Sequence, residues 1–331
     1  TAMQYKSHRP ALSEIGDELG VAYALEGTVR WAQGADGVSR VRITPQLIRV
    51  ADDTHLWSQS YDRVLDDIFL VQSELAKQGL EQLDITLSGS QQDLVEAQPT
   101  ENLDAYQAYL RGRYLDSLPH FSLENWNKAL ASFERAVELD PGFALAWGQL
   151  SRAHARLVYY LVDASVERLD LARQAADRAA ELAPDAPETH LTRGYYFLLA
   201  ERDAASAERH FEIAARTLPD SAAVLEARGE AARLQGHMEE ALDRYRRAAE
   251  LSPLESSPVT EMGMTYWWSR RYSEALKAFD RAIALAPDQM WPYLGKTFNF
   301  WSWKGVAPEG RAALDTVPLT NPWGAWTWYW P

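Results

Sequence analysis

The chain has 331 residues, 47% of them hydrophobic, which is enough apolar material for folded cores rather than a disordered chain. Its formal net charge of −14 argues against a surface for nucleic acid or an anionic membrane, because both need clustered lysine and arginine. It contains no cysteine, which excludes disulfides, thiolate metal sites and cysteine nucleophiles. We find no apolar run near the length of about 18 residues that a membrane span requires.

Residues 1–87 predict a small α/β domain. The elements expected, in chain order, are a short helix capped by Ser13 and ended by Gly20, strands at 23–31, 41–47 and 55–61, and a helix at 65–83. The turn signal at 34–37 makes the first two strands a hairpin. Pro45 cannot donate to a ladder, so its strand is predicted to be an edge strand or to carry a bulge.

Residues 88–100 predict a polar linker, and from residue 101 the chain is helical with a period of 34 residues. Two regular copies lie between Pro219 and Pro287. Small residues recur where two helices must approach closely, an aromatic residue fills the gap, and a proline ends each copy. The matched positions are Gly229, Ala241, Tyr245, Ala248 and Pro253 in one copy, and Gly263, Ala275, Phe279, Ala282 and Pro287 in the next.

This pattern resembles the tetratricopeptide repeat. The resemblance implies a superhelix of about six helical hairpins over 101–331, the last ones divergent or truncated. The second repeat carries an insertion of about nine residues near 159–166, and a divergent sixth repeat starts at Met290. The expected fold class is therefore mostly α, a tetratricopeptide-repeat superhelix preceded by a small, truncated α/β domain.

The sequence offers no catalytic or metal-binding motif. We find no phosphate-binding glycine loop, no Gly-x-Ser-x-Gly and no His-Glu-x-x-His. His190 and His210 fall in one repeat, but His190 stands at a packing position, which favours a structural histidine over a metal ligand. Arg244, Arg246 and Arg247 are interleaved with acidic residues, as on a solvated helix face. We expect no enzymatic activity, cofactor or metal site in this fragment.

The repeat resemblance also implies a partner groove, lined by the second, fifth, ninth, twelfth and thirteenth positions of the first helix of each repeat. Aromatic and arginine side chains are frequent interface anchors, so we expect a protein or peptide partner, apolar toward the C-terminal end. The groove should run from a basic end to an aromatic end. The alternative is that Trp267, Trp268 and Trp301 only cover neighbouring repeats. The candidate groove residues are Arg152, Arg156, Tyr195, Arg233, Met264, Trp267, Trp268, Trp291, Phe298 and Trp301.

The runs LEGTVR (25–30), VRITPQLI (41–48), HLWS (55–58), YDR (61–63) and DIF (67–69) resemble the small α/β domain of the TolB amino-terminal and FlgO families. In bacteria that domain precedes tetratricopeptide repeats in adenylate cyclases, serine/threonine kinases and CadC-type regulators. The family's domain begins with a further strand and helix, and this chain starts at Thr1 rather than methionine, so we expect a fragment.

The two resemblances together imply a non-catalytic regulatory or interaction module of a larger bacterial signalling protein, with its output domain outside this fragment. The alternative is a stand-alone scaffold or envelope-assembly protein with no enzymatic output domain. The compartment stays open between the cytoplasm and the extracytoplasmic part of a membrane-anchored protein.

Overall fold

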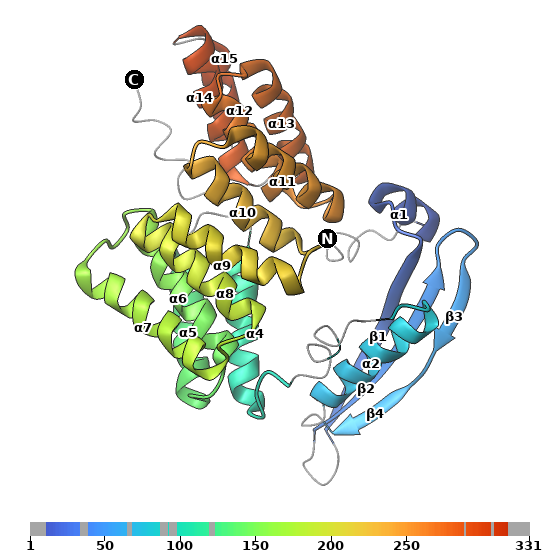
Figure 1. Cartoon of the computed structure of the whole chain (residues 1–331). Coiled ribbons are helices and arrows are strands. Elements are labelled where there is room, and N and C mark those ends of the chain that lie inside the picture. Colours follow the sequence, from blue (N-terminus) through green and yellow to red (C-terminus); the bar gives the residue numbers. More distant parts are fainter. Residues whose placement is uncertain are drawn as a thin grey trace. The chain divides into compact units, whose positions relative to one another are not determined.

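The structure is a computed structural model, and it describes residues 11–33, 39–64, 68–86, 92, 98–118, 123–287, 289–305 and 308–316. The chain divides into two compact units, Thr1–Gln98 and Pro99–Pro331 (Figure 1). The predicted turn at 34–37 and most of the predicted linker at 88–100 lie outside the described residues. Each unit is considered by itself below.

The N-terminal unit is a small antiparallel sheet with two helices. Its elements are α1 (Leu12–Leu19), β1 (Tyr23–Gln33), β2 (Ser39–Arg49), β3 (Thr54–Ser58), β4 (Tyr61–Val64) and α2 (Ile68–Gln82). The predicted order of elements is confirmed, except that the single strand expected at 55–61 is two short strands. Gly20 ends α1 with a φ of +65°, as expected, whereas its N-cap is Ala11 rather than Ser13.

Strand β2 lies in the middle of the sheet, so the first alternative predicted for the Pro45 strand, an edge strand, is wrong, whereas the second, a bulge, agrees with an irregularity between Leu47 and Ile48. β1 pairs along one side of β2, while β3 and β4 follow one another along the other side. The Pro45 carbonyl oxygen accepts a hydrogen bond from the Gln59 amide at 3.4 Å, so the backbone groups of Pro45 face the break between β3 and β4. The missing N–H of proline therefore falls where the ladder is already interrupted, and a register shift follows at Leu47 and Ile48.

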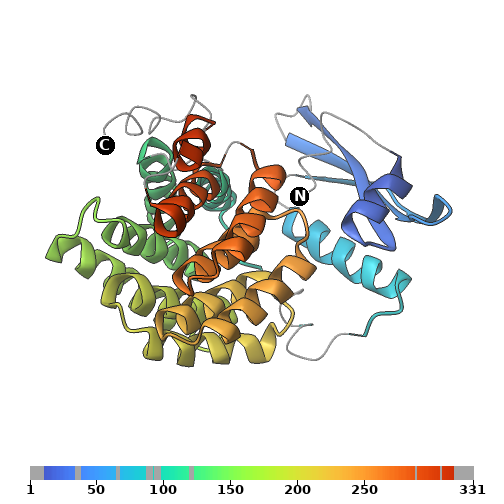
Figure 2. The ribbon, with the colours of Figure 1, turned by 90° about the horizontal axis from the view of Figure 1, so that it is seen from above.

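In its described residues the C-terminal unit is a series of six helical hairpins, which Figures 1 and 2 show side by side in two views. The first helix of each hairpin packs against its second helix, and from α6 to α12 it also packs against the first helix of the next hairpin. The hairpins are α4 (Leu103–Ser117) with α5 (Leu123–Leu139), α6 (Ala144–Tyr159) with α7 (Val166–Leu182), α8 (Pro187–Tyr195) with α9 (Ala204–Thr217), α10 (Ala222–Leu234) with α11 (Met238–Leu251), α12 (Ser256–Trp268) with α13 (Tyr272–Leu285), and α14 (Met290–Lys304) with α15 (Pro308–Asp315).

A glycine facing an aromatic ring sets the closest approach within the regular hairpins. A Cβ added to Gly229 would lie 2.7 Å from Cε1 of Tyr245, and one added to Gly263 would lie 2.6 Å from Cε1 of Phe279. Both rings are fully buried. The spacing of the repeat predicts that Gly263 packs against Ala275, but the three atoms nearest to the added Cβ all belong to Phe279. The Phe279 ring also meets Gly295 of α14, so it fills the gap between two hairpins, as predicted.

Two departures from the regular period have local structural solutions. The insertion in the second hairpin lengthens α6 to Tyr159 and ends it in a loop, where Leu161 has a φ of +56°. The third hairpin is one residue longer than the 34-residue period, and a π-helical turn, η3 (Tyr196–Glu201), follows α8 there. A π turn accommodates one extra residue without breaking the helix. In the described ranges, no helix combines the length and apolarity needed to cross a bilayer.

Candidate partner-binding strip

The first helices of successive hairpins contact one another in sequence, α6 with α8, α8 with α10, α10 with α12 and α12 with α14 (Figure 2). All ten predicted groove residues lie on these helices, so the structure places them on one row of neighbouring elements. The contacts described below add four residues to these ten, of which Glu230 also falls on the strip by the repeat register. We call the following set the first-helix strip: Arg152, Arg156, Tyr160, Tyr195, Glu226, Glu230, Arg233, Glu261, Met264, Trp267, Trp268, Trp291, Phe298 and Trp301.

Arg156 is held at the N-terminal end of the strip by a carboxylate and an aromatic ring. It forms an ion pair with Asp116 at the end of α4, and both side chains are largely buried. Its guanidinium also lies over the Trp126 ring, 4.7 Å from the ring centroid. Neither partner belongs to the predicted set, because both come from the preceding hairpin. The charge of Arg156 is thus neutralised inside the protein.

Arg152 and Tyr195 form the next contact along the strip. The Arg152 guanidinium lies 4.6 Å from the centroid of the Tyr195 ring, which carries the strip from α6 to α8. Burial raises the pKa of the Tyr195 phenol to about 12, with the carboxylates of α10 and α12 adding to the effect. Tyr195 therefore stays neutral and offers its ring face to the arginine.

Arg233 is the most buried charged residue of the strip, with 6% of its surface exposed. Its Nη2 lies 2.9 Å from Oε2 of Glu261, and its guanidinium lies 4.8 Å from the centroid of the Trp268 ring. Like Arg156, it is paired with a carboxylate from a neighbouring first helix. The arginines therefore do not give the strip the basic end that the sequence led us to expect.

Glu226 and Glu230 lie on α10, between the strip residues of α6 and α8 and those of α12 and α14. Burial, with a smaller contribution from Glu261, raises the pKa of each carboxyl to about 7. Arg152 acts in the opposite direction on both, and Arg233 does so on Glu230. The only hydrogen bond found for either carboxylate in the described part of the chain runs from Ser257 Oγ to Glu226 Oε2, at 2.6 Å.

The aromatic end of the strip is a cluster between α12 and α14. The Trp267 and Phe298 rings are stacked with centroids 6.0 Å apart, and Trp301 follows Phe298 at 5.9 Å. Trp267 also donates a hydrogen bond from Nε1 to Ser302 Oγ at 2.9 Å. Trp301 lies against Gly310 of α15, a contact that fits the alternative reading in which this tryptophan covers a neighbouring helix.

The insertion in the second hairpin reaches the far end of the strip. Tyr160, at the end of α6, packs against Trp126 of the first hairpin at 5.2 Å and against Trp291 of the sixth hairpin at 6.1 Å, measured between ring centroids. Tyr160 and Trp291 each remain 38% exposed. Tyr160 was not predicted, because the insertion lies outside the 34-residue register. Through Tyr160, the second hairpin contacts Trp291 of the sixth hairpin, so the two ends of the strip are in contact.

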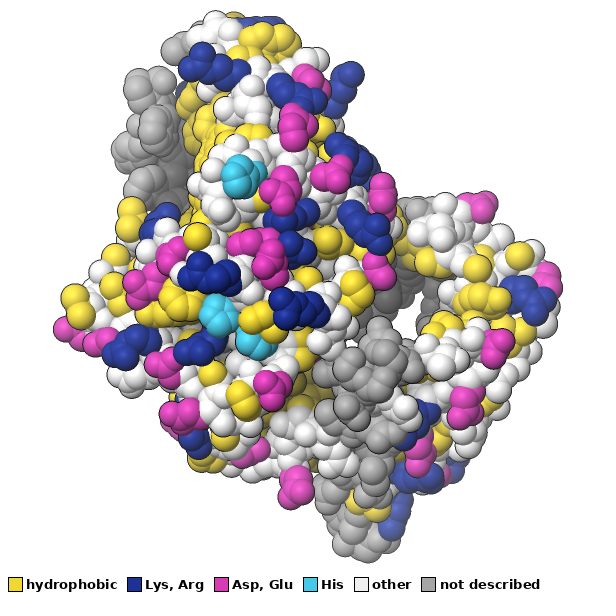
Figure 3. Space-filling view, viewed as in Figure 1, with side chains coloured by type: hydrophobic (Ala, Val, Ile, Leu, Met, Phe, Trp, Pro, Cys, Tyr) yellow, Lys and Arg dark blue, Asp and Glu magenta, His cyan; other side chains and the backbone are white. Residues whose placement is uncertain are grey.

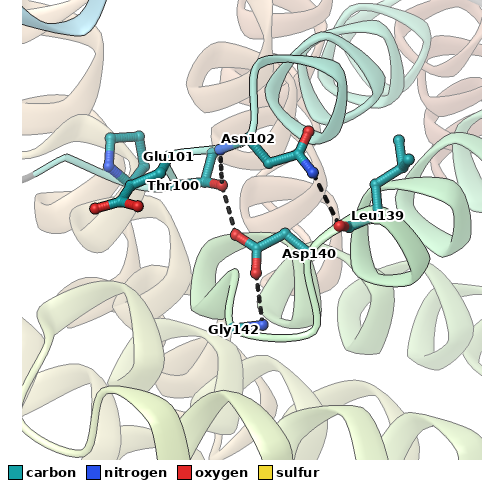
Figure 4. Close-up of a pocket in the computed structure, with 7 residues that line it drawn as sticks. Thr100, Glu101, Asn102, Leu139, Asp140 and Gly142 are labelled. Atoms are coloured by element: carbon teal, nitrogen blue, oxygen red, sulfur yellow. Dashed lines mark hydrogen bonds between the residues drawn. The ribbon is translucent and has the colours of Figure 1, made fainter.

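A shallow polar pocket at the start of α4 is a structural cap (Figure 4). Asn102 accepts the Ala105 amide at 3.0 Å and donates Nδ2 to the Leu139 carbonyl at 2.9 Å, so it joins the start of α4 to the end of α5. Thr100 donates to Asp140, whose other oxygen accepts the Gly142 amide at 2.8 Å. These polar groups satisfy one another, which accounts for the pocket without a ligand.

His190 and His210 are brought together, with 3.2 Å between their Nδ1 atoms. Burial lowers the pKa of both, with smaller contributions from neighbouring arginines and, for His210, from His190, and the pKa of His210 is about 4. His210 also stacks on Phe197 at 5.5 Å. Within the described ranges no group of three or more His, Asp or Glu side chains is arranged to hold a metal ion. A neutral packed pair agrees with the structural role inferred from the sequence.

Charges outside the strip are mixed rather than segregated. Figure 3 shows Lys and Arg side chains interspersed with Asp and Glu on the face of the helical unit that it presents. Arg244 pairs with Glu208 at 3.1 Å, Arg246 with Asp243 at 2.7 Å, and Arg247 with Asp220 at 2.7 Å. The arginine-rich run of α11 is thus an ion-paired helix face, as the sequence indicated.

A family model described as "Tetratricopeptide repeat" matches residues 120–187 and 191–256, which span parts of the first five hairpins. The hairpins within these ranges match the tetratricopeptide repeat. A thermophilic tetratricopeptide protein of Thermus thermophilus has the same fold, with a TM-score of 0.50 and 17% identity over 59% of this chain and 98% of that one. A human IFIT1 dimer structure gives a TM-score of 0.54 at 14% identity, over 76% of this chain and 56% of that one.

One curated relative shares more sequence with the chain. It is named "Putative adenylate cyclase 3", comes from Rhizobium meliloti (strain 1021), and is 31% identical over 193 residues. The alignment covers 58% of this chain and 32% of the relative. The chain therefore spans about a third of the length of the curated relative that it matches.

Proposed function

We propose that the chain is a non-catalytic regulatory and interaction module of a larger bacterial signalling protein, and that its first-helix strip binds a peptide or a partner domain. The repeat fold supports the interaction role, since tetratricopeptide superhelices are extended binding surfaces. The likeness to part of a protein named as an adenylate cyclase supports the signalling context. On this proposal the output activity belongs to sequence outside this chain.

The N-terminal unit fits the same proposal. Its strand and helix order agrees with a partial TolB amino-terminal or FlgO-like domain over 1–87, joined by a linker at 88–100 to repeats over 101–331. Exposed apolar residues on β1 support this reading, because Leu25 is 61% exposed and Val29 is 52% exposed. A sheet face left uncovered in this way is consistent with elements of the domain lying outside the fragment.

The observation that carries the binding proposal is the composition of the strip. Arginine and aromatic side chains are stacked along it, yet Trp268 and Trp291 keep 44% and 38% of their surface exposed. Tryptophan and arginine contribute most of the free energy at typical protein interfaces, because they bury large areas at a small entropic cost. A row of such side chains on adjacent first helices is therefore suited to a peptide or an extended protein segment.

The test is selection of peptides from a random displayed library on the purified chain, followed by titration calorimetry. The double substitution Trp268→Ala with Phe298→Ala should weaken binding of the selected peptides about a hundredfold, since two aromatic anchors are worth about 2–4 kcal/mol together. Its helical circular dichroism should be unchanged. The matched control is Trp303→Ala with Leu171→Ala, which removes two exposed apolar side chains outside the strip, each 44% exposed in the native chain.

Three results would count against the proposal. Peptides that bind the control pair less tightly than the strip variant would place the binding surface elsewhere. Loss of the helical signal in the strip variant would mean that Trp268 and Phe298 serve the fold, as in the alternative reading. Production of cyclic AMP from ATP by the purified chain would contradict its non-catalytic role.

A further inference from the structure

Glu226 and Glu230 are two carboxylates of the strip that have few hydrogen-bond partners and no ion-pair partner in the described part of the chain. They are four residues apart on α10 and therefore share one face of that helix. Glu226 accepts a single hydrogen bond, from a neutral hydroxyl of Ser257. Glu230 has neither a hydrogen bond nor an ion pair within the described part of the chain, and its oxygens are not among the fully buried, unpartnered atoms there. Solvent, and hence a ligand, can reach them.

The surrounding arginines are already engaged with other groups and compensate these two charges only in part. Arg156 is paired with Asp116, Arg233 is paired with Glu261, and Arg152 is stacked on a tyrosine ring. Within the strip and Asp116, three arginines therefore stand beside four carboxylates. The carboxyl pKa values near 7 have the same origin, because burial and Glu261 outweigh the two arginines that act on Glu230. A further positive charge would be stabilised here.

Aromatic rings belong to the same strip as these carboxylates. Trp268 lies under the Arg233 guanidinium, 4.8 Å from ring centroid to Cζ, and Arg233 is paired with Glu261. Burial, followed by Glu261 and Glu230, raises the pKa of the Tyr160 phenol. Tyr160 in turn contacts Trp291, and both rings are partly exposed. Aromatic faces attract ammonium and guanidinium groups, and they also cover the methylene stems of lysine and arginine.

Resting on the proposed function, we infer that the strip binds a segment in which a lysine or arginine is flanked by apolar residues. The cationic head lies against Glu226 and Glu230, between α10 and the end of α6. The apolar neighbours lie against Trp268, Tyr160 and Trp291. An acidic segment is disfavoured, because its carboxylates would add to an excess of negative charge that the strip already carries.

The experiment uses the full chain and peptides selected from the random library. Selected peptides should be enriched in lysine or arginine at one position with apolar neighbours. A synthetic copy whose basic residue is replaced by norleucine keeps the apolar stem, and it should bind about tenfold more weakly, as expected for loss of one charge-assisted contact. The variant Glu226→Gln with Glu230→Gln should lose about tenfold for the basic peptide and nothing for the norleucine peptide. Glu181→Gln, an exposed carboxylate on α7, is the control and should change neither.

The outcomes separate this inference from the function on which it rests. Peptides that depend on Trp268 but carry no basic residue, or an acidic one, would overturn the inference and leave the proposed function standing. Equal loss of the basic and norleucine peptides in the glutamine variant would also overturn it, because the carboxylates would then act on the fold. If no peptide can be selected on the native chain, both proposals are contradicted.

Discussion

Glu230 is the residue at which the requirements of binding and of stability conflict most clearly. Its folded-state pKa of about 7 lies above the ordinary value of 4.5, so the folded protein holds this proton more tightly than the unfolded chain does. The resulting stability is fully present below pH 4.5 and is lost as the pH rises through 7. At neutral to alkaline pH the ionised, partly buried carboxylate therefore lowers the free energy of unfolding. A bound cationic partner would offset this destabilisation.

We therefore predict that Glu230→Gln stabilises the protein at pH 8 and has little effect at pH 5. The gain should be about 1–2 kcal/mol, after allowing for partial screening by solvent of a shift worth 1.4 kcal/mol per pKa unit. Urea unfolding at the two pH values measures it. Glu181→Gln, which removes an exposed carboxylate of α7, is the control. A variant that is less stable than the native chain at pH 8 would mean that Glu230 makes favourable contacts which the structure does not show.

At the scale of the elements, each regular hairpin depends on contact between a glycine and an aromatic ring. Alanine is favoured over glycine in a helix by about 1 kcal/mol, so Gly263→Ala would stabilise a helix with free space beside it. Here the new methyl group meets the buried Phe279 ring at 2.6 Å. We predict a net loss of about 1–3 kcal/mol for Gly263→Ala and a larger loss for Gly263→Leu.

The rescue experiment isolates that contact. Phe279→Leu alone should be destabilising, but combining it with Gly263→Ala should cost less than the sum of the two single changes, because the smaller side chain leaves room for the methyl group. Thermal melting of the three variants measures the coupling. Additive losses, or no loss for Gly263→Ala, would show that the hairpin register is misassigned.

The elements also show what the sequence could and could not predict. The 34-residue period placed Gly263, Phe279 and the ten strip residues on the correct helices, because the repeat code is local and regular. It paired Gly263 with Ala275, whereas the atoms nearest to the added Cβ belong to Phe279, since spacing along the chain does not say which side chain fills a gap. Tyr160 and the π turn after α8 were not predicted, because both lie where residues are inserted relative to the 34-residue repeat.

The charge pairs of the strip were beyond prediction for a different reason. Arg156 with Asp116 and Arg233 with Glu261 join adjacent first helices, and their separations in sequence are fixed by no motif. A run of arginines on a strip therefore suggested a basic surface. Only the packed arrangement shows that these arginines are neutralised and that Glu226 and Glu230 carry the uncompensated charge.

At the scale of the whole molecule, the division into Thr1–Gln98 and Pro99–Pro331 leads to a prediction about shortened chains. A chain of residues 99–331 should keep the helical circular dichroism of the repeats and melt within about 2 °C of their transition in the full chain. A chain of residues 103–331 lacks Thr100 and Asn102, which cap α4 and bind the end of α5. It should melt about 2–6 °C lower, corresponding to about 1–2 kcal/mol. An unfolded 99–331 chain would show that the repeats need the N-terminal unit.

The most direct test of the account locates a bound peptide on the first-helix strip. Incorporation of 5-fluorotryptophan gives each tryptophan a fluorine resonance, which single Trp→Phe variants assign. On titration with a selected peptide, we predict that the resonances of Trp268 and Trp291 shift, while those of Trp303, stacked on Tyr272, and Trp147, bonded to the Pro141 carbonyl, stay in place. Shifts confined to Trp303 or Trp147, with Trp268 and Trp291 unchanged, would contradict the claim that the strip is the binding surface.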